Sequence, residues 1–451
     1  MKARNQISIF KHRFNLLDLL QYILFLLFIV FLIFNIFTKL NSPGLMDDAT
    51  LIQKYPNLYD NFIQFQIEGW GGFFILAYVT NFINISILNF FGSNFYYFFN
   101  FLYIFFEIFI IYKVFSKFIK IDPGIFLIVF LVYPYFTDYF FFPSLQVKYI
   151  FLIFTFLLFL LQYKVNKKYF LSFILGLLIP LIKLEASPLI VILLLIYFDS
   201  RFNKKRTLFA LVGMTISNIM AVFVFINFRG SYTLEIKNNI SNSLIKNIVY
   251  NFINSYDLIF IFISLLFASY FVFKRKDLLL IGLIAYDFIV ILLITTFRIS
   301  NYYLSGILIY SVAILFAYIF KNYKLIPNQK AVFTILLPFL IIFSTTFLFE
   351  PRFDRWYGIA NINNVLLEVP SDKDIYHSCS EAAESLSFFN SRPIKYEDFE
   401  RLRYLNDSYY FIFDSFNCGL VQNQILNTCK YSVLSANKST EFKVLKISSC
   451  S

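Results

Sequence analysis

The chain alternates between long apolar runs and short clusters of basic residues. Many of the runs approach the roughly 20 residues that a helix needs to cross the hydrocarbon core of a membrane. Apolar residues make up 59% of the chain and charged residues 15%, and the mean hydropathy is +0.69. Soluble proteins usually carry about 25% charged residues. The sequence therefore predicts an all-α, polytopic integral membrane protein.

The apolar runs predict about eleven membrane-spanning helices. The stretch Gly71–Phe91 is also apolar, but Asn81, Asn84 and Asn89 interrupt it. We expect it to lie in the interface or to re-enter the membrane, the alternative being a further span. The predicted spans are about Leu16–Phe37, Phe95–Phe115, Gly124–Phe141, Tyr149–Gln162, Tyr169–Ile182, Ser187–Phe198, Leu208–Phe228, Leu258–Phe273, Leu278–Thr296, Tyr303–Phe320 and Ala331–Phe349.

The basic clusters set the expected orientation, because cytoplasmic loops of membrane proteins are rich in Lys and Arg. A cluster precedes the first predicted span and another follows each even-numbered span, for example Arg201 to Arg206 and Lys274 to Lys276. This pattern predicts a cytoplasmic N-terminus and a C-terminus outside the cytoplasm. It also accounts for the net charge of +12 without a nucleic-acid partner.

The abundant Phe, Tyr, Ile, Asn and Lys suggest an AT-rich bacterial genome, and so the cytoplasmic (inner) membrane.

The composition changes at Glu350, where charged residues and serines become frequent. We expect residues 1–349 to form the membrane domain and residues 350–451 to form a small α/β domain outside the cytoplasm, of ordinary domain size. Its predicted strands are Asp374–Ser378, Tyr409–Phe413 and Phe442–Ile447, and its predicted helices are Ser380–Phe389 and Glu397–Leu405.

All four cysteines lie in this tail, which suits an oxidising compartment and one or two disulfides. Three connectivities are open. Free thiols and a zinc site are the competing interpretations, but the tail has no Cys-x2-Cys pair for zinc, and its one histidine, His377, is in no ligand pattern. The disulfide candidates are Cys379, Cys418, Cys429 and Cys450.

The first outward loop, about Thr38–Asn94, contains an acidic pair, Asp47-Asp48, soon after the turn at Pro43-Gly44. An aspartate in this position can cap the helix predicted to follow it. Alternatively, one aspartate is a general base that accepts a proton from a sugar hydroxyl as the hydroxyl attacks an anomeric carbon. Glu68, later in the same loop, is a candidate for the same cavity.

Ionisable residues near the ends of spans are functional candidates because they are costly in a membrane. Lys183, Arg298 and Lys148 are predicted at the outer face, where each can bind a lipid phosphate. The alternatives are pairing of Lys183 with Glu185 and snorkelling of Arg298 to the interface. Asp138 and Glu185 are further acceptor or cavity candidates, whereas Glu107 and Asp287 lie deeper, and each is expected to bond a neighbouring helix.

Several segments together resemble the GT-C superfamily of glycosyltransferases, which use sugars linked to polyprenyl or dolichyl phosphate and include the dolichyl-phosphate-mannose mannosyltransferases and the aminoarabinose transferases. Met46-Asp47-Asp48-Ala49 resembles the acidic pair of the family's first loop, although many members have Glu where Asp48 stands. The resemblance covers most of the membrane part. The other similar segments are Glu68–Gly92, Gly176–Pro188 and Arg298–Tyr303.

The resemblance implies an inverting transfer on the outer face, with Asp47 as catalytic base and with Asp48 either supporting Asp47 or holding the acceptor. The implied partners are a polyprenyl-phosphate-linked sugar, a lipid, glycan or protein acceptor, and membrane lipids. No cofactor is certain, but a loop with several acids allows a divalent cation. No Walker loop or Rossmann fingerprint is present, as expected for a donor that is not a nucleotide sugar.

Two other classes of protein share these features. An O-antigen or polysaccharide polymerase is equally aromatic and polytopic, but its large loop usually lies in mid-chain. A transporter or flippase commonly shows internal repeats and broken helices in matched halves. We find no such repeat in this chain.

Overall fold

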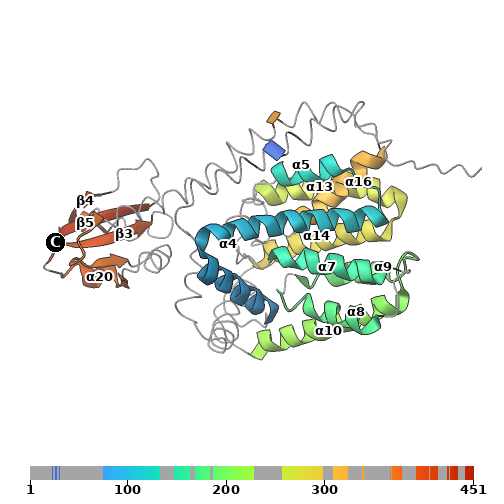
Figure 1. Ribbon diagram of the computed structural model, residues 1–451, viewed down its shortest axis with the longest axis horizontal. Coiled ribbons are helices and arrows are strands. Elements are labelled where there is room, and N and C mark those ends of the chain that lie inside the picture. The colour runs from blue at the N-terminus through green and yellow to red at the C-terminus, as the bar shows by residue number, and fades with distance from the viewer. Residues whose placement is uncertain are drawn as a thin grey trace, which may run out of the picture.

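The computed structural model shows a mostly helical protein with a small C-terminal sheet (Figure 1). It describes residues 75–132, 147–162, 168–182, 186–227, 256–297 and 308–323 of the membrane part. In the tail it describes residues 366, 368–377, 393–405, 407–414, 424–425, 427–434 and 442–450, and elsewhere only the isolated residues 23, 26, 27, 30, 338 and 339. The predicted domain boundary at Glu350 lies outside the described residues.

Each described helix of the membrane part overlaps one of the second to tenth predicted spans, and parts of the third and tenth predicted spans lie outside the described residues. Within the described residues, three segments are long and apolar enough to cross a membrane: Phe98–Phe118, Lys204–Phe223 and Leu278–Thr296. Most of the first and eleventh predicted spans lies outside the described residues. The helices are α4 (Ile75–Phe118), α5 (Pro123–Val132), α7 (Val147–Leu161), α8 (Tyr169–Leu178), α9 (Leu189–Ile196), α10 (Lys204–Asn227), α13 (Tyr256–Arg275), α14 (Leu278–Phe297) and α16 (Leu308–Tyr323).

Helix α4 is longer than the predicted second span, because it begins at Ile75 and runs on to Phe118. It therefore includes most of the stretch Gly71–Phe91, which we expected to be a separate element. Figure 1 shows that the helix changes direction between its first part and its long second part. The Gly92-Ser93 pair within α4 is the kind of sequence at which helices bend without breaking.

Helices α8 and α9 are shorter than the predicted fifth and sixth spans. Helix α8 ends at Leu178, before Pro180, and α9 begins at Leu189, after Pro188. Proline has no backbone N–H to donate, so Pro180 cannot continue the hydrogen bonds of α8. Pro180 therefore limits α8 at its C-terminal end, and Pro188 lies directly before the first residue of α9.

Helices α8 and α10 pack closely against each other at two glycines, Gly176 and Gly213. A Cβ atom placed on Gly176 would lie 2.2 Å from the backbone oxygen of Ala210, and one on Gly213 would lie 2.2 Å from that of Phe173. Glycines at such positions let two helix backbones approach closely, as is common between membrane helices.

An aromatic cluster forms the centre of the bundle and joins four helices. Phe151 of α7 stacks on Tyr310 of α16 at a centroid distance of 5.3 Å and meets Tyr286 of α14 edge-on at 6.0 Å. Phe130 of α5 packs against the same Tyr310 at 5.3 Å. These four rings are almost completely buried. They fix α5, α7, α14 and α16 side by side.

The tail forms a five-stranded mixed sheet in the order β2-β1-β3-β5-β4. Strand β1 is parallel to β2 and β3, whereas β5 is antiparallel to β3 and β4. The elements are β1 (Ile375–His377), β2 (Ile394–Tyr396), the short helix α20 (Phe399–Leu402), β3 (Tyr409–Asp414), β4 (Cys429–Val433) and β5 (Phe442–Cys450).

The predicted tail strands correspond to β1, β3 and β5, and part of the predicted helix Glu397–Leu405 is α20. Strands β2 and β4 were not predicted, since Ile394-Lys395-Tyr396 is very short and β4 is polar and largely exposed. The predicted helix Ser380–Phe389 lies outside the described residues.

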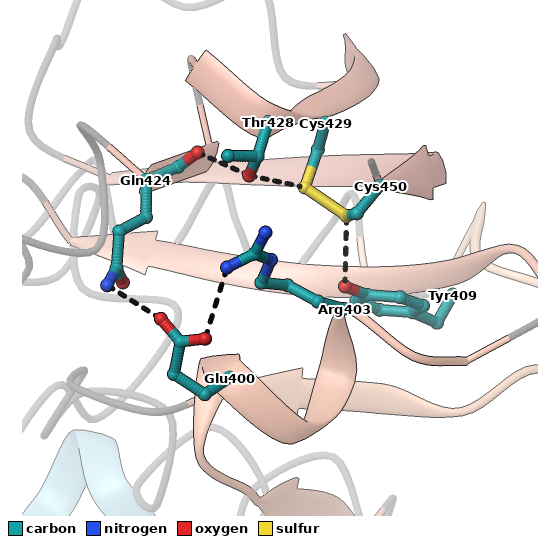
Figure 2. Close-up of a disulfide and its surroundings, with 7 residues drawn as sticks. All are labelled: Glu400, Arg403, Tyr409, Gln424, Thr428, Cys429 and Cys450. Atoms are coloured by element: carbon teal, nitrogen blue, oxygen red, sulfur yellow. Dashed lines mark hydrogen bonds and ion pairs between the residues drawn. A yellow bond between two sulfur atoms is a disulfide. The ribbon is translucent and has the colours of Figure 1, made fainter.

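Strand β3 is buried on both faces, which makes it the centre of the tail. Tyr410 and Ile412 pack on one face, and Tyr409 and Phe411 pack on the other. At the edge of the sheet, Cys429 of β4 is the register partner of Cys450 of β5, and the two form a disulfide (Figure 2). Cys379 and Cys418 lie outside the described residues.

Candidate functional site

Most of the site residues expected from the sequence lie outside the described residues. These are Asp47, Asp48, Glu68, Asp138, Lys183, Glu185 and Arg298. Lys148 is the second residue of α7, and its side chain is not described.

The basic turns of the sequence meet at one end of the helix bundle, which we call the basic end. The Asn322 side chain at the end of α16 donates to the Lys120 carbonyl oxygen after α4, at 3.0 Å. The Asn203 N–H in the α9–α10 turn donates to the Leu161 carbonyl oxygen at the end of α7, at 2.8 Å. Arg201 joins this turn to the α13–α14 turn. The ends of α4, α7 and α16 and these two turns thus lie together.

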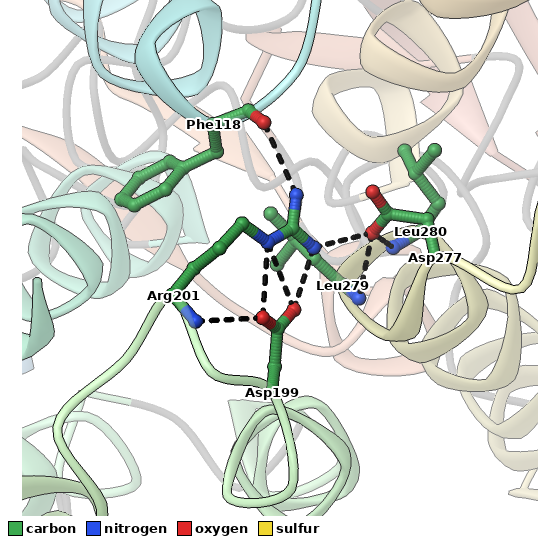
Figure 3. Close-up of polar contacts among 6 residues, drawn as sticks. All are labelled: Phe118, Asp199, Arg201, Asp277, Leu279 and Leu280. Carbon is green, nitrogen blue, oxygen red and sulfur yellow. Dashed lines mark hydrogen bonds and ion pairs between the residues drawn. The ribbon is translucent and has the colours of Figure 1, made fainter.

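Arg201 is the centre of a polar network at the basic end (Figure 3). Its guanidinium donates to both oxygens of Asp199, at 2.6 to 3.0 Å, and to Asp277 Oδ1 at 2.7 Å. It also donates to the Phe118 carbonyl oxygen of α4 at 3.1 Å. One side chain therefore connects α4, the α9–α10 turn and the α13–α14 turn.

Charge pairing dominates the environment of Arg201. Burial alone would lower the pKa of its guanidinium, but the hydrogen bonds to Asp199 and Asp277 outweigh burial and raise the pKa above its ordinary value. Asp277 Oδ1 also accepts from the N–H groups of Leu279 and Leu280, which caps the first turn of α14. The network is a structural clamp, because its donors and acceptors are already engaged with one another.

A polar pocket of about 540 Å³ opens beside this clamp. Its wall includes Lys120, Arg275 and Lys276, all exposed, together with Tyr318 and Asn322 of α16. Among the described residues, no carboxylate forms an ion pair with any of these three cations. The pocket therefore offers positive charge that the clamp does not use.

The opposite end of the bundle carries the start of α4. The Leu76 N–H donates to the Leu181 carbonyl oxygen at 3.2 Å. Leu181 follows α8, which begins at the basic end, where Arg206 lies 5.9 Å from the Tyr169 ring. The connection between α8 and α9 therefore lies away from the basic turns. In sequence, Leu76 follows the acidic loop and Leu181 precedes Lys183 by two residues.

A polar pair links two helices inside the bundle. The Ser311 hydroxyl of α16 donates to Asp287 Oδ1 of α14, and both residues are buried. This confirms the expectation that Asp287 bonds a neighbouring helix. Glu107 is also fully buried, in α4. The Ser311–Asp287 pair therefore links α14 to α16. Both Asp287 and Glu107 are closed off from solvent, so neither belongs to an accessible site.

The tail carries a surface ion pair at one side of its sheet. Lys395 Nζ of β2 lies 2.7 Å from Asp374 Oδ1, and the Tyr376 hydroxyl donates to Asp374 Oδ2 at 3.0 Å. The hydrogen bond from Lys395 is the main reason that the pKa of Asp374 lies below its ordinary value; burial opposes this shift, and the hydrogen bond from Tyr376 adds to it. The pair is half exposed and therefore contributes little stability.

Within the described residues, no group of three or more His, Cys, Asp or Glu is placed to hold a metal ion.

The clamp was not predicted from the sequence. Arg201 was assigned only to a basic cluster, and Asp199 and Asp277 were given no role. The available signal was an acid within each basic turn, Asp-Ser-Arg before α10 and Asp277 directly after Lys-Arg-Lys. Acids inside such turns indicate capping and pairing rather than a purely positive surface.

No protein-family model, curated protein or solved structure matches this chain. The described part of the chain defines the class: a mostly helical protein with three candidate membrane-spanning segments among its described helices and a small, disulfide-linked C-terminal sheet.

Proposed function

We propose that this protein is a membrane glycosyltransferase of the GT-C kind, which moves a sugar from a polyprenyl-phosphate carrier to a glycan, lipid or protein acceptor. The reaction takes place on the outer face of the cytoplasmic membrane. The observation that carries the proposal is the hydrogen bond from Leu76 to Leu181, because it joins the helix after the acidic loop to the segment before Lys183.

Chain connectivity brings the predicted phosphate-binding cations toward the same end. Lys183 follows Leu181 by two residues, which is roughly 7 Å of chain. Arg298 follows the last residue of α14, a 20-residue helix about 30 Å long that starts at the basic end. Lys148 lies in the first turn of α7, whose last residue, Leu161, contacts the basic end. The described residues next to these cations in the chain, Leu181, Phe297 and the first turn of α7, therefore lie away from the basic turns, which supports a shared site for the three cations.

The transfer follows from these roles. Asp47 accepts the proton of the acceptor hydroxyl, whose oxygen forms a bond to the anomeric carbon as the bond from that carbon to the carrier phosphate breaks. The configuration inverts, and polyprenyl phosphate leaves with its charge neutralised by Lys183, Arg298 and Lys148. Asp48 orients Asp47, and Glu68, Asp138 and Glu185 line the acceptor side. The acids of the loop also allow a divalent cation at the phosphate.

The basic end supports the required orientation. Positive turns mark the cytoplasmic side of membrane proteins, so the opposite end, with the acidic loop, faces outward. A disulfide in the tail is suited to that oxidising side.

Asp47→Asn tests the proposal in full-length protein reconstituted into lipid vesicles with a panel of polyprenyl-phosphate sugars. We expect transfer of labelled sugar to fall by roughly 100-fold or more, because a general base contributes at least that much. Asp60→Asn, which removes another acid from the same loop, is the matched control and should leave transfer intact. Full transfer by Asp47→Asn would overturn the role of Asp47.

The same assay separates the alternatives. A polymerase would extend a lipid-linked glycan into a ladder of products, whereas a transporter or flippase would move labelled lipid across the vesicle without forming a new glycosidic bond. Either result would replace the proposed function.

A further inference from the structure

The pocket at the basic end has a net positive charge although the clamp in its wall, with one arginine and two aspartates, has a net charge of −1. Four cations and two carboxylates line it, which gives a net charge of +2. Asp199 and Asp277 both bind Arg201. The remaining charge belongs to Lys120, Arg275 and Lys276, which come from two different connections of the chain.

Arg275 is held in position by an aromatic ring. Its guanidinium lies 5.5 Å from the centre of the Tyr323 ring, and the Tyr323 hydroxyl donates to the Phe271 carbonyl oxygen at 2.7 Å. A guanidinium packed on a ring face keeps its N–H edge available for an anion. Lys120 and Lys276 add two flexible point charges. Together they match a phosphate group, which accepts several hydrogen bonds.

An exposed aromatic side chain borders the same pocket. Phe198 lines it and is 72% exposed, next to the buried Asp199. An exposed Phe at the end of a helix bundle that carries apolar, membrane-length segments is suited to contact acyl chains. The pocket thus combines a polar, positive interior with an apolar border. This combination is complementary to a phospholipid, which has an anionic phosphate and apolar acyl chains.

We propose that this pocket binds the phosphate headgroup of an anionic phospholipid at the cytoplasmic face of the membrane. Basic pockets between membrane helices on that side are suited to such headgroups. Lys120, Arg275 and Lys276 contact the phosphate, the clamp of Arg201, Asp199 and Asp277 keeps the surrounding turns in place, and Phe198 lies along the lipid. The site is distinct from the proposed sugar-transfer site and does not depend on it.

The test measures lipid binding by full-length protein in a neutral detergent, using native mass spectrometry and thermal shift. The probes are phosphatidylglycerol, zwitterionic phosphatidylcholine and inorganic phosphate. We expect phosphatidylglycerol to bind and stabilise the protein, phosphatidylcholine to bind at least tenfold more weakly, and inorganic phosphate to compete only at high concentration. Equal binding of the two lipids would overturn the proposal, and tight binding of inorganic phosphate alone would assign the pocket to a soluble phosphate instead.

Two triple variants give a matched comparison. Lys120→Gln with Arg275→Gln and Lys276→Gln removes the charge of the pocket, and Lys204→Gln with Lys205→Gln and Lys321→Gln removes equal charge from exposed positions at the same end outside the pocket. The first should weaken phosphatidylglycerol binding roughly 100-fold, at about fivefold for each charge. The second should change it less than fivefold.

Equal losses in the two triple variants would show a diffuse surface effect and contradict the proposal. If the first triple variant does not fold, Arg275→Gln alone against Lys204→Gln alone gives the same comparison with a smaller factor. No difference between these single variants would also contradict it.

Discussion

At the scale of single residues, Arg201 is the position where a substitution should be most costly at the basic end. Arg201→Ala leaves Asp199, which is 9% exposed, and Asp277 facing each other without a cation. We expect a loss of about 2–4 kcal/mol of unfolding free energy, because breaking a largely buried ion pair strands the remaining charge. The measurement is the thermal midpoint of the full-length protein in detergent.

Two substitutions serve as controls for Arg201→Ala. Arg201→Lys keeps the charge but loses the planar fork that reaches two carboxylates and a carbonyl, so it should recover only part of the stability. Lys205→Ala removes an exposed charge in the same turn region and should change the midpoint little. Equal midpoints for Arg201→Ala and Lys205→Ala would contradict the structural role of Arg201.

The sequence predicts the contact of a side chain only where its contact partner lies nearby along the chain. The cap of α14 by Asp277 follows from an acid directly before an apolar run. The contacts of Arg201 with Asp277 and with the Phe118 carbonyl oxygen join positions 76 and 83 residues apart. Such contacts depend on helix packing, which hydropathy does not specify. The pairing of Cys429 with Cys450 was likewise one of several open connectivities until the register of β4 and β5 fixed it.

At the scale of elements, the contact of α8 with α10 should depend on two glycines. Gly176→Ala places a Cβ atom 2.2 Å from the Ala210 carbonyl oxygen, a backbone atom that cannot move aside without shifting the helix. We expect destabilisation of about 1–3 kcal/mol from this overpacking. The thermal midpoint of the full-length protein measures it.

Gly282→Ala is the matched control for Gly176→Ala, because Gly282 is also a helical glycine at a helix contact. Its added Cβ atom would lie 3.1 Å from Ile192 Cα, with the Ile192 side chain at 3.3 Å, so a small shift accommodates it. Alanine also favours a helix over glycine by about 1 kcal/mol. A larger loss for Gly282→Ala than for Gly176→Ala would show that backbone proximity is not what limits these contacts.

The elements show which parts of the fold hydropathy predicts. Apolar runs predicted the positions of the helices from α4 to α16, because burial in the bundle or in lipid needs apolar side chains. The ends were less predictable: Pro180 limits α8 at its C-terminal end, α9 begins directly after Pro188, and α4 begins some 20 residues before the predicted span. Polar β4 in the tail was missed, because an edge strand needs only one buried face.

At the scale of the whole molecule, the two proposed sites are assigned to opposite ends of the same bundle. The phosphate pocket is built from the turns at the basic end, whereas the Leu76–Leu181 contact holds the connection from the acidic loop at the other end. The proposed sites themselves are unequally predictable. The acidic loop was recognised from its sequence, but the pocket depends on turns that meet only when the helices pack.

Reporter fusions test this orientation directly. Alkaline phosphatase, which folds only where disulfides form, should be inactive when fused after Asn203 in the α9–α10 turn and active when fused after Ser451. A fluorescent protein that folds only in the cytoplasm should give the reverse pattern. Phosphatase activity after Asn203 would place the positive pocket outside the cytoplasm. That result would contradict the proposal that the pocket binds an anionic lipid of the cytoplasmic leaflet. Phosphatase inactivity after Ser451 would instead place the Cys429–Cys450 pair in a reducing compartment, where a structural disulfide in the tail does not persist.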